Sequence, residues 1–278
     1  MATTTVTSMA GTLEVMSAEA MHAFLTGSVC FGAVWTQAAM APAITVRFPT
    51  LAGTARKAYV SAHVEGAAIT GYQTPITATD ATLAEYVQYS PTSLLTLASN
   101  PGAAAKIGAL LGQQIANTVD HNIAYLISGC STNTITSTDG TAMADLWAAV
   151  GKIQDNGYMG ALSAILHPKQ YYGPSGLAAN LLGTATPQTT SVQDELMRAG
   201  WVNRIGNVDI FVSNQVQAYS TYYRGAILAK EAIGLGYSDP LISLRSAFEP
   251  SIHAEGFSAA SYHKAVLIDE LGVAQIVS

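Results

Sequence analysis

Apolar residues follow a regular spacing between positions 100 and 129, the longest such stretch in the chain. A spacing of four residues puts the apolar side chains on one face of an α-helix. The stripe comprises Ile107, Leu111, Ile115, Val119, Ile123 and Ile127, widened by Leu110 and Leu126. The pattern predicts a single helix of about 28 residues, roughly 42 Å long at 1.5 Å per residue, with a sheet packed along its apolar face.

The same stretch carries signals for both ends of this helix. Asn100 is a favourable N-cap, Pro101 suits the first turn, and Gly129 is expected to end the helix in the left-handed conformation. The polar residues fall off the stripe, and we expect them on the exposed side of the helix. They are Lys106, Gln113, Gln114, Asn117, Asp120 and His121.

Strict alternation of apolar and polar residues replaces the helical pattern at residues 44–48 and again at 58–64. Alternation of this kind indicates half-buried strands. Together the two stretches predict a long-armed antiparallel hairpin over residues 44–81. It has few bulky apolar residues for a core of its own, and a two-stranded hairpin is marginal alone in water. Its stability should therefore come from a neighbour.

Weaker patterns place the remaining elements. At the N-terminus we expect an extended arm over residues 1–16 and a short helix over 18–25. The late strands should pair with an early strand at 82–90, beside the long helix, which gives an α+β fold. The other expected elements are a helical bridge at 91–99, a helix at 142–156, a strand at 162–166, a broken helix and loop at 171–190, a helix at 192–199 capped by Ser191, strands at 208–212 and 225–230, and late strands within 241–278.

Charge is scarce in this sequence. Only 11% of the 278 residues are charged, against about 25% in ordinary soluble proteins. An unusual monomer is one interpretation, and a surface largely covered by other subunits is the one we prefer. The net charge of −6, without a cluster of Lys or Arg, argues against nucleic-acid binding through a basic patch.

Cysteine content and hydropathy bear on the compartment. Cys30 and Cys130 form neither a disulfide framework nor a CxxC pair, which fits a reducing compartment and leaves a single bridge open. Residues 23–46 lack charge, but polar residues and Pro42 interrupt the run and no basic flank orients it. We expect a soluble protein made inside the cell, without a membrane span.

Candidate catalytic and metal-binding groups are few. Ser261 and Lys264 have the SxxK spacing of some serine acylases, but the companion motifs are missing. His121 with Asp120 and Asp155 could in principle meet a metal ion, although exposed helix residues are the simpler interpretation. His253 and Glu255 read as a satisfied polar pair on a strand. The sequence therefore predicts no catalytic residue, no metal site and no cofactor.

Charged residues in the hairpin are the candidate functional residues. Glu65 stands where charges are scarce, and with Arg47, Arg56 and Lys57 it could form ion pairs between subunits. Such pairs fix the register of an interface more than its affinity. Plain solvated charges are the alternative.

Several stretches resemble the major capsid proteins of tailed phages, and the order of the expected elements is similar to their Hong Kong 97-type shell fold. The resemblance covers roughly residues 44–278. It is carried by RFP at 47–49, VEGAAI at 64–69, LAEYVQYSPTSLL at 83–95, LGQQIANTVDHNIAYLI at 111–127, ILHPKQYY at 165–172 and RGAILAKEAIG at 224–234.

The resemblance implies a capsid fold built from an N-terminal arm, an E-loop hairpin, a peripheral domain with a long spine helix, and an axial domain. The implied bounds are 1–43 for the arm, 44–81 for the E-loop, 82–130 and 226–278 for the peripheral domain, and 131–225 for the axial domain. Other copies of the chain, as pentamers and hexamers, would form an icosahedral shell around double-stranded DNA in the virion, after synthesis in the host cytoplasm.

The same resemblance implies a separate scaffolding protein, a portal and a cement protein as further partners. The lysine–asparagine crosslink of some members does not carry over, because no motif identifies a partner for Lys57. An encapsulin-type bacterial nanocompartment shell has the same fold and is the alternative function. An unrelated α/β enzyme is the third.

Overall fold

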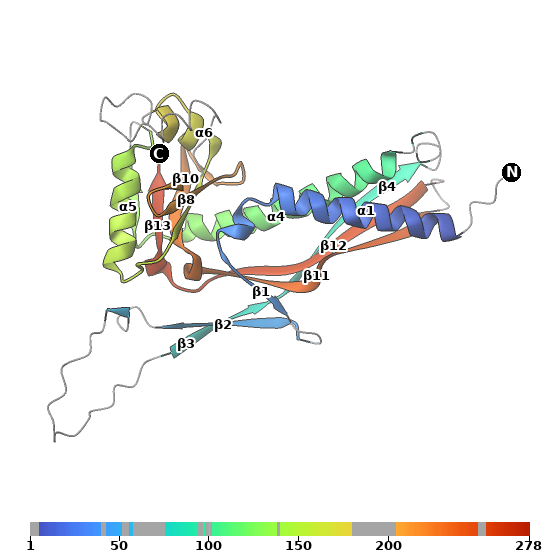
Figure 1. The fold of residues 1–278 in the computed structure, drawn as a ribbon, viewed down its shortest axis with the longest axis horizontal. Helices are drawn as coiled ribbons and strands as arrows, with labels where there is room; N and C mark the ends of the chain where they lie inside the picture. The colour runs from blue at the N-terminus through green and yellow to red at the C-terminus, as the bar shows by residue number, and fades with distance from the viewer. Residues whose placement is uncertain are drawn as a thin grey trace, which may run out of the picture.

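The computed structural model describes residues 6–39, 43–51, 56–57, 76–93, 97, 100, 102–137, 140–179, 204–249 and 254–278. The subunit is elongated (Figure 1). Two helices lie along a long sheet in one half, and a second sheet with its own helices forms the other end. A two-stranded hairpin root lies against the long sheet near the junction. Helices and strands both make up the core, as the α+β assignment predicts.

The long sheet has the strand order β1-β11-β12-β4, with β1 parallel to β11 and the other neighbours antiparallel. The pairing of late strands with an early strand beside the long helix is confirmed. The early strand begins at Ala84 rather than 82, because residues 76–82 belong to the hairpin. The strands are β1 (Trp35–Ala39), β4 (Ala84–Ser93), β11 (Ile233–Glu249) and β12 (Ala254–Leu267).

The second sheet has the order β5-β13-β10-β6-β8-β7, with β9 paired to β10. The helix expected at 142–156 is α5 (Met143–Asp155), which ends at Gly157 with a φ of 88°. The strands expected at 162–166 and 208–212 are confirmed as β6 and β8. The full set is β5 (Thr134–Thr136), β6 (Leu162–Leu166), β7 (Arg204–Ile205), β8 (Val208–Val212), β9 (Ala218–Tyr219), β10 (Tyr222–Ala229) and β13 (Val273–Val277).

Short helical segments complete the subunit. They are α6 (Pro168–Tyr172), η1 (Cys30–Gly32), η2 (Lys230–Ala232) and η3 (Glu270–Gly272). Part of the loop expected at 171–190, and all of the helix expected at 192–199 with its cap Ser191, lie outside the described residues. In the bridge expected at 91–99, residues 91–93 belong to β4 instead, and most of the rest also lies outside the described residues.

The long helix is α4 (Ala103–Gly129), and its predicted stripe is buried from Leu111 to Ile127. Both predicted ends are wrong. Asn100 does not cap the helix through its side chain; its carbonyl accepts from the amide of Ala103, and Gly102 occupies the N-cap position. Gly129 is the last helical residue, and the chain leaves through Cys130 in an extended conformation.

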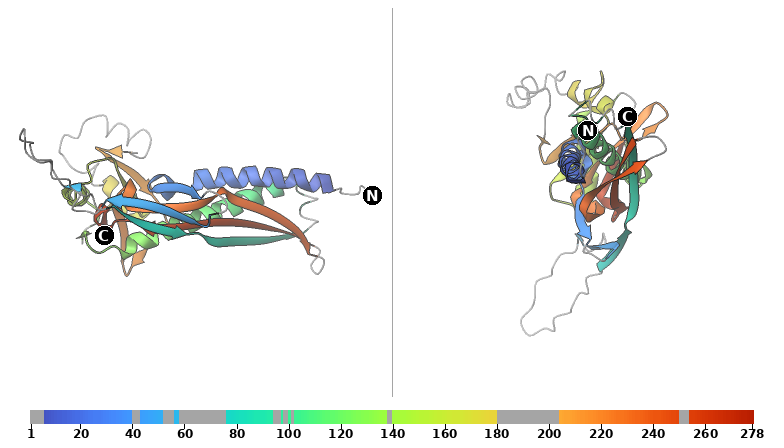
Figure 2. Two further views of the ribbon diagram at one scale, coloured as in Figure 1. Left: turned by 90° about the horizontal axis from the view of Figure 1, so that it is seen from below. Right: turned by 90° about the vertical axis from the view of Figure 1, so that its right-hand side faces the viewer.

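The predicted extended arm is also wrong over the described residues, because α1 (Val6–Gly27) is one continuous helix. It runs parallel to α4 along the same face of the long sheet (Figure 2). Met16, Ala20 and Phe24 are fully buried on its inner side. The stripe is weak in the sequence because alanine, serine and threonine fill most of the helix around it.

Glycines of α4 allow the two helices to pack backbone to backbone. A Cβ atom at Gly108 would press on the backbone of Met16, and one at Gly112 on the backbone of Ala20. The two contacts are four residues apart on both helices, so the helices keep a constant register. Close packing of this kind leaves no room for a side chain at the crossing.

Asp120 fixes the end of this helix pair. Its carboxylate accepts hydrogen bonds from the Ser28 hydroxyl at 2.9 Å and from the amides of Val29 and Cys30 at 3.0 Å. The expectation that Asp120 is exposed is wrong, since only 2% of the residue is accessible. Burial raises the pKa of this carboxyl, and the amide donors oppose that shift.

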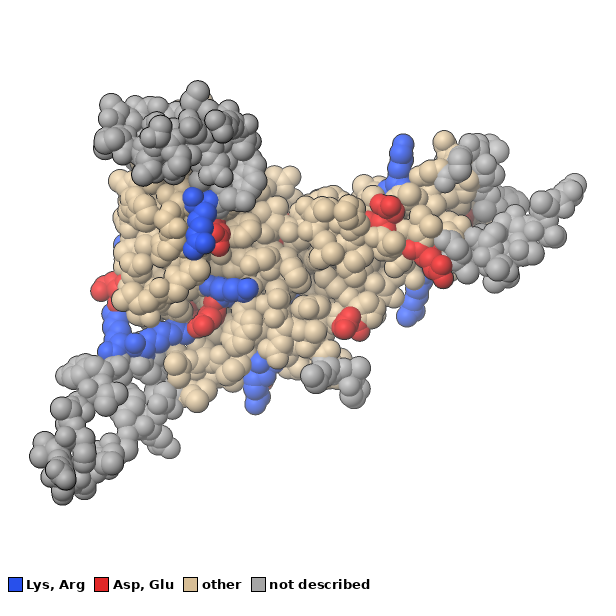
Figure 3. Space-filling model, viewed as in Figure 1, with Lys and Arg blue, Asp and Glu red and all other residues tan. Residues whose placement is uncertain are grey.

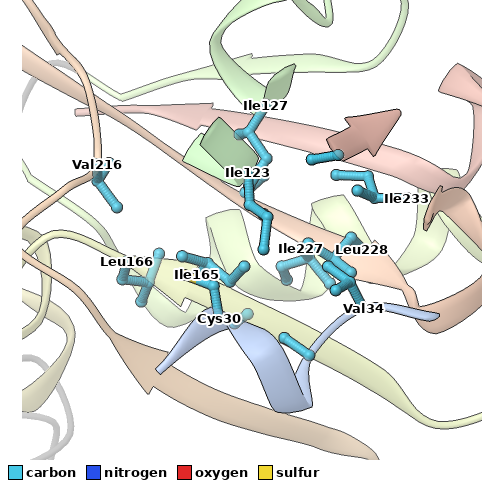
Figure 4. Packing of buried hydrophobic residues seen from close by; sticks show 14 of the residues in the cluster. Cys30, Val34, Ile123, Ile127, Ile165, Leu166, Val216, Ile227, Leu228 and Ile233 are labelled. Atoms are coloured by element: carbon cyan, nitrogen blue, oxygen red, sulfur yellow. The ribbon is translucent and has the colours of Figure 1, made fainter. Parts of the chain in front are cut away.

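The hydrophobic core is continuous between the two halves. Ile123 and Ile127 of α4 meet Ile165 and Leu166 of β6, Ile227 and Leu228 of β10, and Cys30 and Val34 after α1 (Figure 4). Cys30 and Cys130 are both free and buried, and burial raises the pKa of each thiol, that of Cys130 to about 11. The second half of α4 therefore joins the long sheet to the second sheet.

We expect Gly112→Ala to destabilise the subunit by about 1–3 kcal/mol, because the added methyl group forces α1 away from α4. The matched control is Gly151→Ala in α5, where nothing lies within 4 Å of the new methyl group. That change should leave stability unchanged or raise it by up to about 1 kcal/mol. Urea unfolding monitored by circular dichroism measures both; equal midpoints for the two variants would contradict the close packing.

Candidate functional site at the root of the hairpin

The hairpin consists of β2 (Thr45–Leu51) and β3 (Ile76–Thr82). They pair antiparallel, with Thr45 opposite Thr82 and Leu51 opposite Ile76. The hairpin predicted over residues 44–81 is thus present at its root. The returning strand predicted at 58–64 lies outside the described residues, and the strand that pairs with β2 is β3.

One face of the root packs on its own subunit. Val46, Phe48 and Ala81 are buried, and the ring of Trp35 meets Phe48 edge to face at 5.2 Å. Gly234 of β11 makes room for this contact, because a Cβ atom there would press on the Phe48 ring. The root therefore has no core of its own, as expected from its few bulky apolar residues, and the neighbour on which it packs is the long sheet of the same subunit.

Arg47 lies on the outer face of the hairpin. Its guanidinium forms two hydrogen bonds, of 2.7 and 2.9 Å, to the carboxylate of Asp80 on the neighbouring strand. The guanidinium lowers the pKa of Asp80. Both side chains are well exposed, at 71% and 45%. A cross-strand pair of this kind fixes the register of the hairpin, and Arg47 remains accessible to another molecule.

Arg56 follows the first strand and is held inside the subunit. Its guanidinium lies 2.7 Å from the carboxylate of Asp269, and the two side chains are only 9% and 13% exposed. The central carbon of the guanidinium, Cζ, lies 3.9 Å from the centre of the Tyr158 ring. The hydroxyl of Tyr158 donates a hydrogen bond to the carboxylate of Asp269 at 2.7 Å. Burial is the main cause that raises the pKa of Tyr158, and the hydrogen bond to Asp269 raises it further.

The other two candidate residues are not joined to this cluster. Lys57 is exposed and borders a shallow hollow with Gln154, Asp155 and Met159. Glu65 lies outside the described residues. The structure thus separates the four charges: Arg47 and Lys57 point outward, whereas Arg56 anchors the hairpin to the subunit. The role of these residues between subunits stays a prediction.

An open hollow of about 480 Å³ lies beside the root. Apolar side chains form most of its wall, and three charged residues also line it. Its lining comprises Trp35, Pro49, Thr50, Leu51, Arg56, Ile76, Lys230 and Glu231. Leu51 and Ile76 are 40% and 68% exposed. A concave apolar surface next to a projecting arm is suited to receive part of another polypeptide.

The partners of the two arginines were not identified from the sequence. Asp80 could have been found by pairing residues 44–48 with 76–82 instead of with 58–64, because that register places it opposite Arg47. Asp269 is 213 residues from Arg56, and no local pattern connects the two.

The candidate catalytic residues, Ser261 and Lys264, do not lie together in the structure. Ser261 and His263 are fully buried, so neither can reach a substrate. Lys264 is exposed and points to the opposite face of β12, because side chains alternate along a strand. The SxxK spacing therefore brings no serine and lysine together.

The metal alternative fails in the same way. His121 contacts Gln217, and Asp120 is bound to the turn after α1. No group of three or more His, Cys, Asp or Glu side chains in the described ranges could hold a metal ion. Glu255 is buried, and its proposed partner His253 lies outside the described residues. No helix in the part of the chain described is both long and apolar enough to cross a bilayer.

No protein-family model and no curated protein matches this chain. Solved structures do. A structure from Microbacterium phage Oxtober96 gives a TM-score of 0.65 at 15% identity, over 90% of each chain. The capsid of Ralstonia phage GP4 gives 0.64 at 12% identity, over 91% of each chain. The holo-SrpI encapsulin complex from Synechococcus elongatus gives 0.55 at 8% identity, over 87% of this chain and 84% of that one.

The similarity covers 90% to 91% of this chain and of these two phage chains. It matches the order of elements that the sequence suggests: a projecting hairpin, a long helix on a sheet, a second sheet, and late strands that return to the first. The chain has the Hong Kong 97-type shell fold found in tailed-phage capsids.

Proposed function

We propose that this chain is the major capsid protein of a tailed phage. Copies of it would assemble as pentamers and hexamers into an icosahedral shell around double-stranded DNA, and the protein would be located in the virion. The observation that carries the proposal is the match to the capsid of Ralstonia phage GP4 over 91% of each chain. A scaffolding protein, a portal and a cement protein would be separate partners.

The distribution of charge supports assembly. Charged side chains are scattered over the face seen in Figure 3, and broad uncharged areas lie between them. A surface of this composition loses little hydration energy when another subunit covers it. Many modest contacts made by one subunit then add up through avidity, so the shell needs no single strong interface.

The division into domains belongs to the same proposal. Residues 82–130 and 226–278 would form the peripheral domain, which holds α4 and the strands β4, β11 and β12 of the long sheet. The end of β10 and all of β13 also fall in this range, although they belong to the second sheet. Residues 131–225 would form the axial domain around the symmetry axes, and 44–81 the E-loop. Residues 1–43 would be the N-terminal arm, although most of it is helical and packs on α4.

An encapsulin-type shell is the second candidate, supported by the match to the SrpI encapsulin complex. Its TM-score of 0.55 is lower than the 0.64 of the phage GP4 capsid, so the phage function is preferred. The two functions differ in their content, which is packaged DNA for a capsid and a protein cargo for an encapsulin.

The experiment that separates them is particle production with and without candidate neighbouring genes, followed by purification and nuclease treatment. For a capsid we expect closed shells by cryo-electron microscopy and nuclease-protected DNA once the packaging proteins are present. Shells that enclose a co-purifying protein, and no DNA under any condition, would favour the encapsulin. A monomer by light scattering under all conditions would contradict both.

The root of the hairpin gives a prediction about the single subunit. Arg56→Ala should lower the free energy of unfolding by about 2–4 kcal/mol, because it leaves the buried carboxylate of Asp269 without its cation. Lys57→Ala is the matched control, because Lys57 is the next residue in the chain and its side chain is exposed. It should not change the free energy of unfolding measurably. Thermal unfolding of the two variants measures the difference, and equal transitions would refute the anchoring role.

The outward charges give a prediction about assembly. Lys57→Glu, and Arg47→Glu combined with Asp80→Arg so that the cross-strand pair is kept, should each reduce the yield of shells while leaving the fold intact. A misplaced charge in a contact is desolvated and repelled, whereas on a free subunit it stays hydrated. Circular dichroism checks the fold, and electron microscopy counts the particles. Arg56→Glu is unsuitable here, since it disrupts the subunit itself. Normal yields of shells would show that these side chains are only solvated charges.

A further inference from the structure

His263 of β12 is buried between the long sheet and α4. Its ring is fully inaccessible, and both of its nitrogens have polar partners. Nδ1 lies 3.0 Å from the hydroxyl of Ser261, and Nε2 lies 3.2 Å from the amide nitrogen of Asn122 on α4. The ring of Tyr86 on β4 stacks on it at 4.3 Å. One side chain therefore connects the helix, the central strand and the edge strand.

The two hydrogen bonds define where the proton of the neutral ring lies. The amide nitrogen of Asn122 is a donor, so Nε2 accepts from it. The proton is then on Nδ1, which donates to the hydroxyl of Ser261. A second proton, on Nε2, would point at the N–H group of Asn122. The site thus fits the neutral ring. A charged ring would require the Asn122 amide to turn its oxygen towards Nε2, and would still lie buried among uncharged side chains.

No charged group faces the ring from the surrounding elements described. The facing side chains are Asn122 from α4, Ser261 from β12, Tyr86 from β4 and Tyr237, the cross-strand partner on β11. The nearest charges along the strands point away: Glu85 accepts from Tyr262 on the opposite face of the sheet, and Lys264 is exposed there. On α4, Asp120 binds the turn after α1 and His121 contacts Gln217.

We propose that His263 acts as an acid-sensitive latch between α4 and the long sheet. In its neutral form it ties Asn122 of the helix to Ser261 of the strand. Protonation replaces the acceptor at Nε2 with a donor, breaks the bond to Asn122 and places a charge in a dry interface. Because the folded subunit resists this protonation, acid shifts the equilibrium towards states in which α4 has separated from the sheet.

The direction of the pH effect follows from the environment. Burial lowers the pKa of His263 from about 6.5 to about 4. The unfolded chain therefore binds a proton that the folded chain refuses between these values. The contribution of the neutral ring is complete above pH 6.5 and is lost as the pH falls towards 4, which raises the unfolding equilibrium constant about 30-fold between pH 7.5 and 5.0.

The test compares the pH dependence of unfolding in the wild-type chain and in His263→Gln. Glutamine does not titrate, so the unfolding constant of the His263→Gln protein should lack the increase of about 30-fold that the wild type shows between pH 7.5 and 5.0. His121→Gln removes an exposed histidine next to Asn122 and should retain the wild-type dependence. Urea unfolding at a series of pH values provides the constants, with light scattering to confirm one assembly state throughout. Asp120 and His167 titrate in all three proteins and cancel in the comparison.

A second variant keeps the proposal open to refutation if the glutamine variant does not fold. Asn122→Asp provides an acceptor for a proton on Nε2, so the acid-induced loss should fall to a few-fold. The same pH dependence in the wild-type, His263→Gln and Asn122→Asp proteins would overturn the latch. Where His263→Gln is unfolded, an unchanged profile of Asn122→Asp alone would overturn it.

Discussion

The close parallel packing of α1 on α4 is the constraint on which the rest of the subunit depends. Because Gly108 and Gly112 admit the backbone of α1, the two helices have a fixed register, and that register brings Ser28 to Asp120. The chain then turns through η1 and enters β1, which adds to the edge of the long sheet beside β11. A glycine contact near one end of the molecule therefore decides where the edge strand lies some twenty residues later.

The position of the hairpin root depends on the same series of contacts. Trp35 begins β1 and packs on Phe48, so the position of the edge strand sets one side of the hairpin root. Arg56 sets the other side through Asp269, which stands just before η3 and the last strand. Two anchors at different points hold an arm in one orientation, whereas a single anchor would leave it free to swing. The subunit thus positions the root of its hairpin through contacts of its own.

The burial of a residue could be predicted from the sequence where the local apolar pattern determines it. It could not be predicted where it depends on a partner far away in the chain. The stripe from Leu111 to Ile127 needs only a helix and an apolar neighbour, and the mostly apolar run of β6 fits a buried strand. By contrast, Asp120 looks like any exposed polar residue until α1 covers it. Of the candidate site, the first strand of the hairpin followed from local alternation, but the strand that pairs with it, β3, was not the one expected. The burial of Arg56 did not follow from a local pattern, because Asp269 is brought to it by the whole fold.

The scarcity of charge now has a physical consequence for assembly. Of the few cations, Arg47, Arg56 and Arg204 are paired within the subunit, with Asp80, Asp269 and Asp209. These pairs fix strand register and the hairpin root, so fewer charges are left to guide contacts between copies. If the chain forms a shell, its interfaces must depend on shape, hydrogen bonds and apolar contact. Such contacts are individually weak and short-ranged, so a subunit whose hairpin root is already held by its own contacts loses less conformational entropy when it joins the lattice.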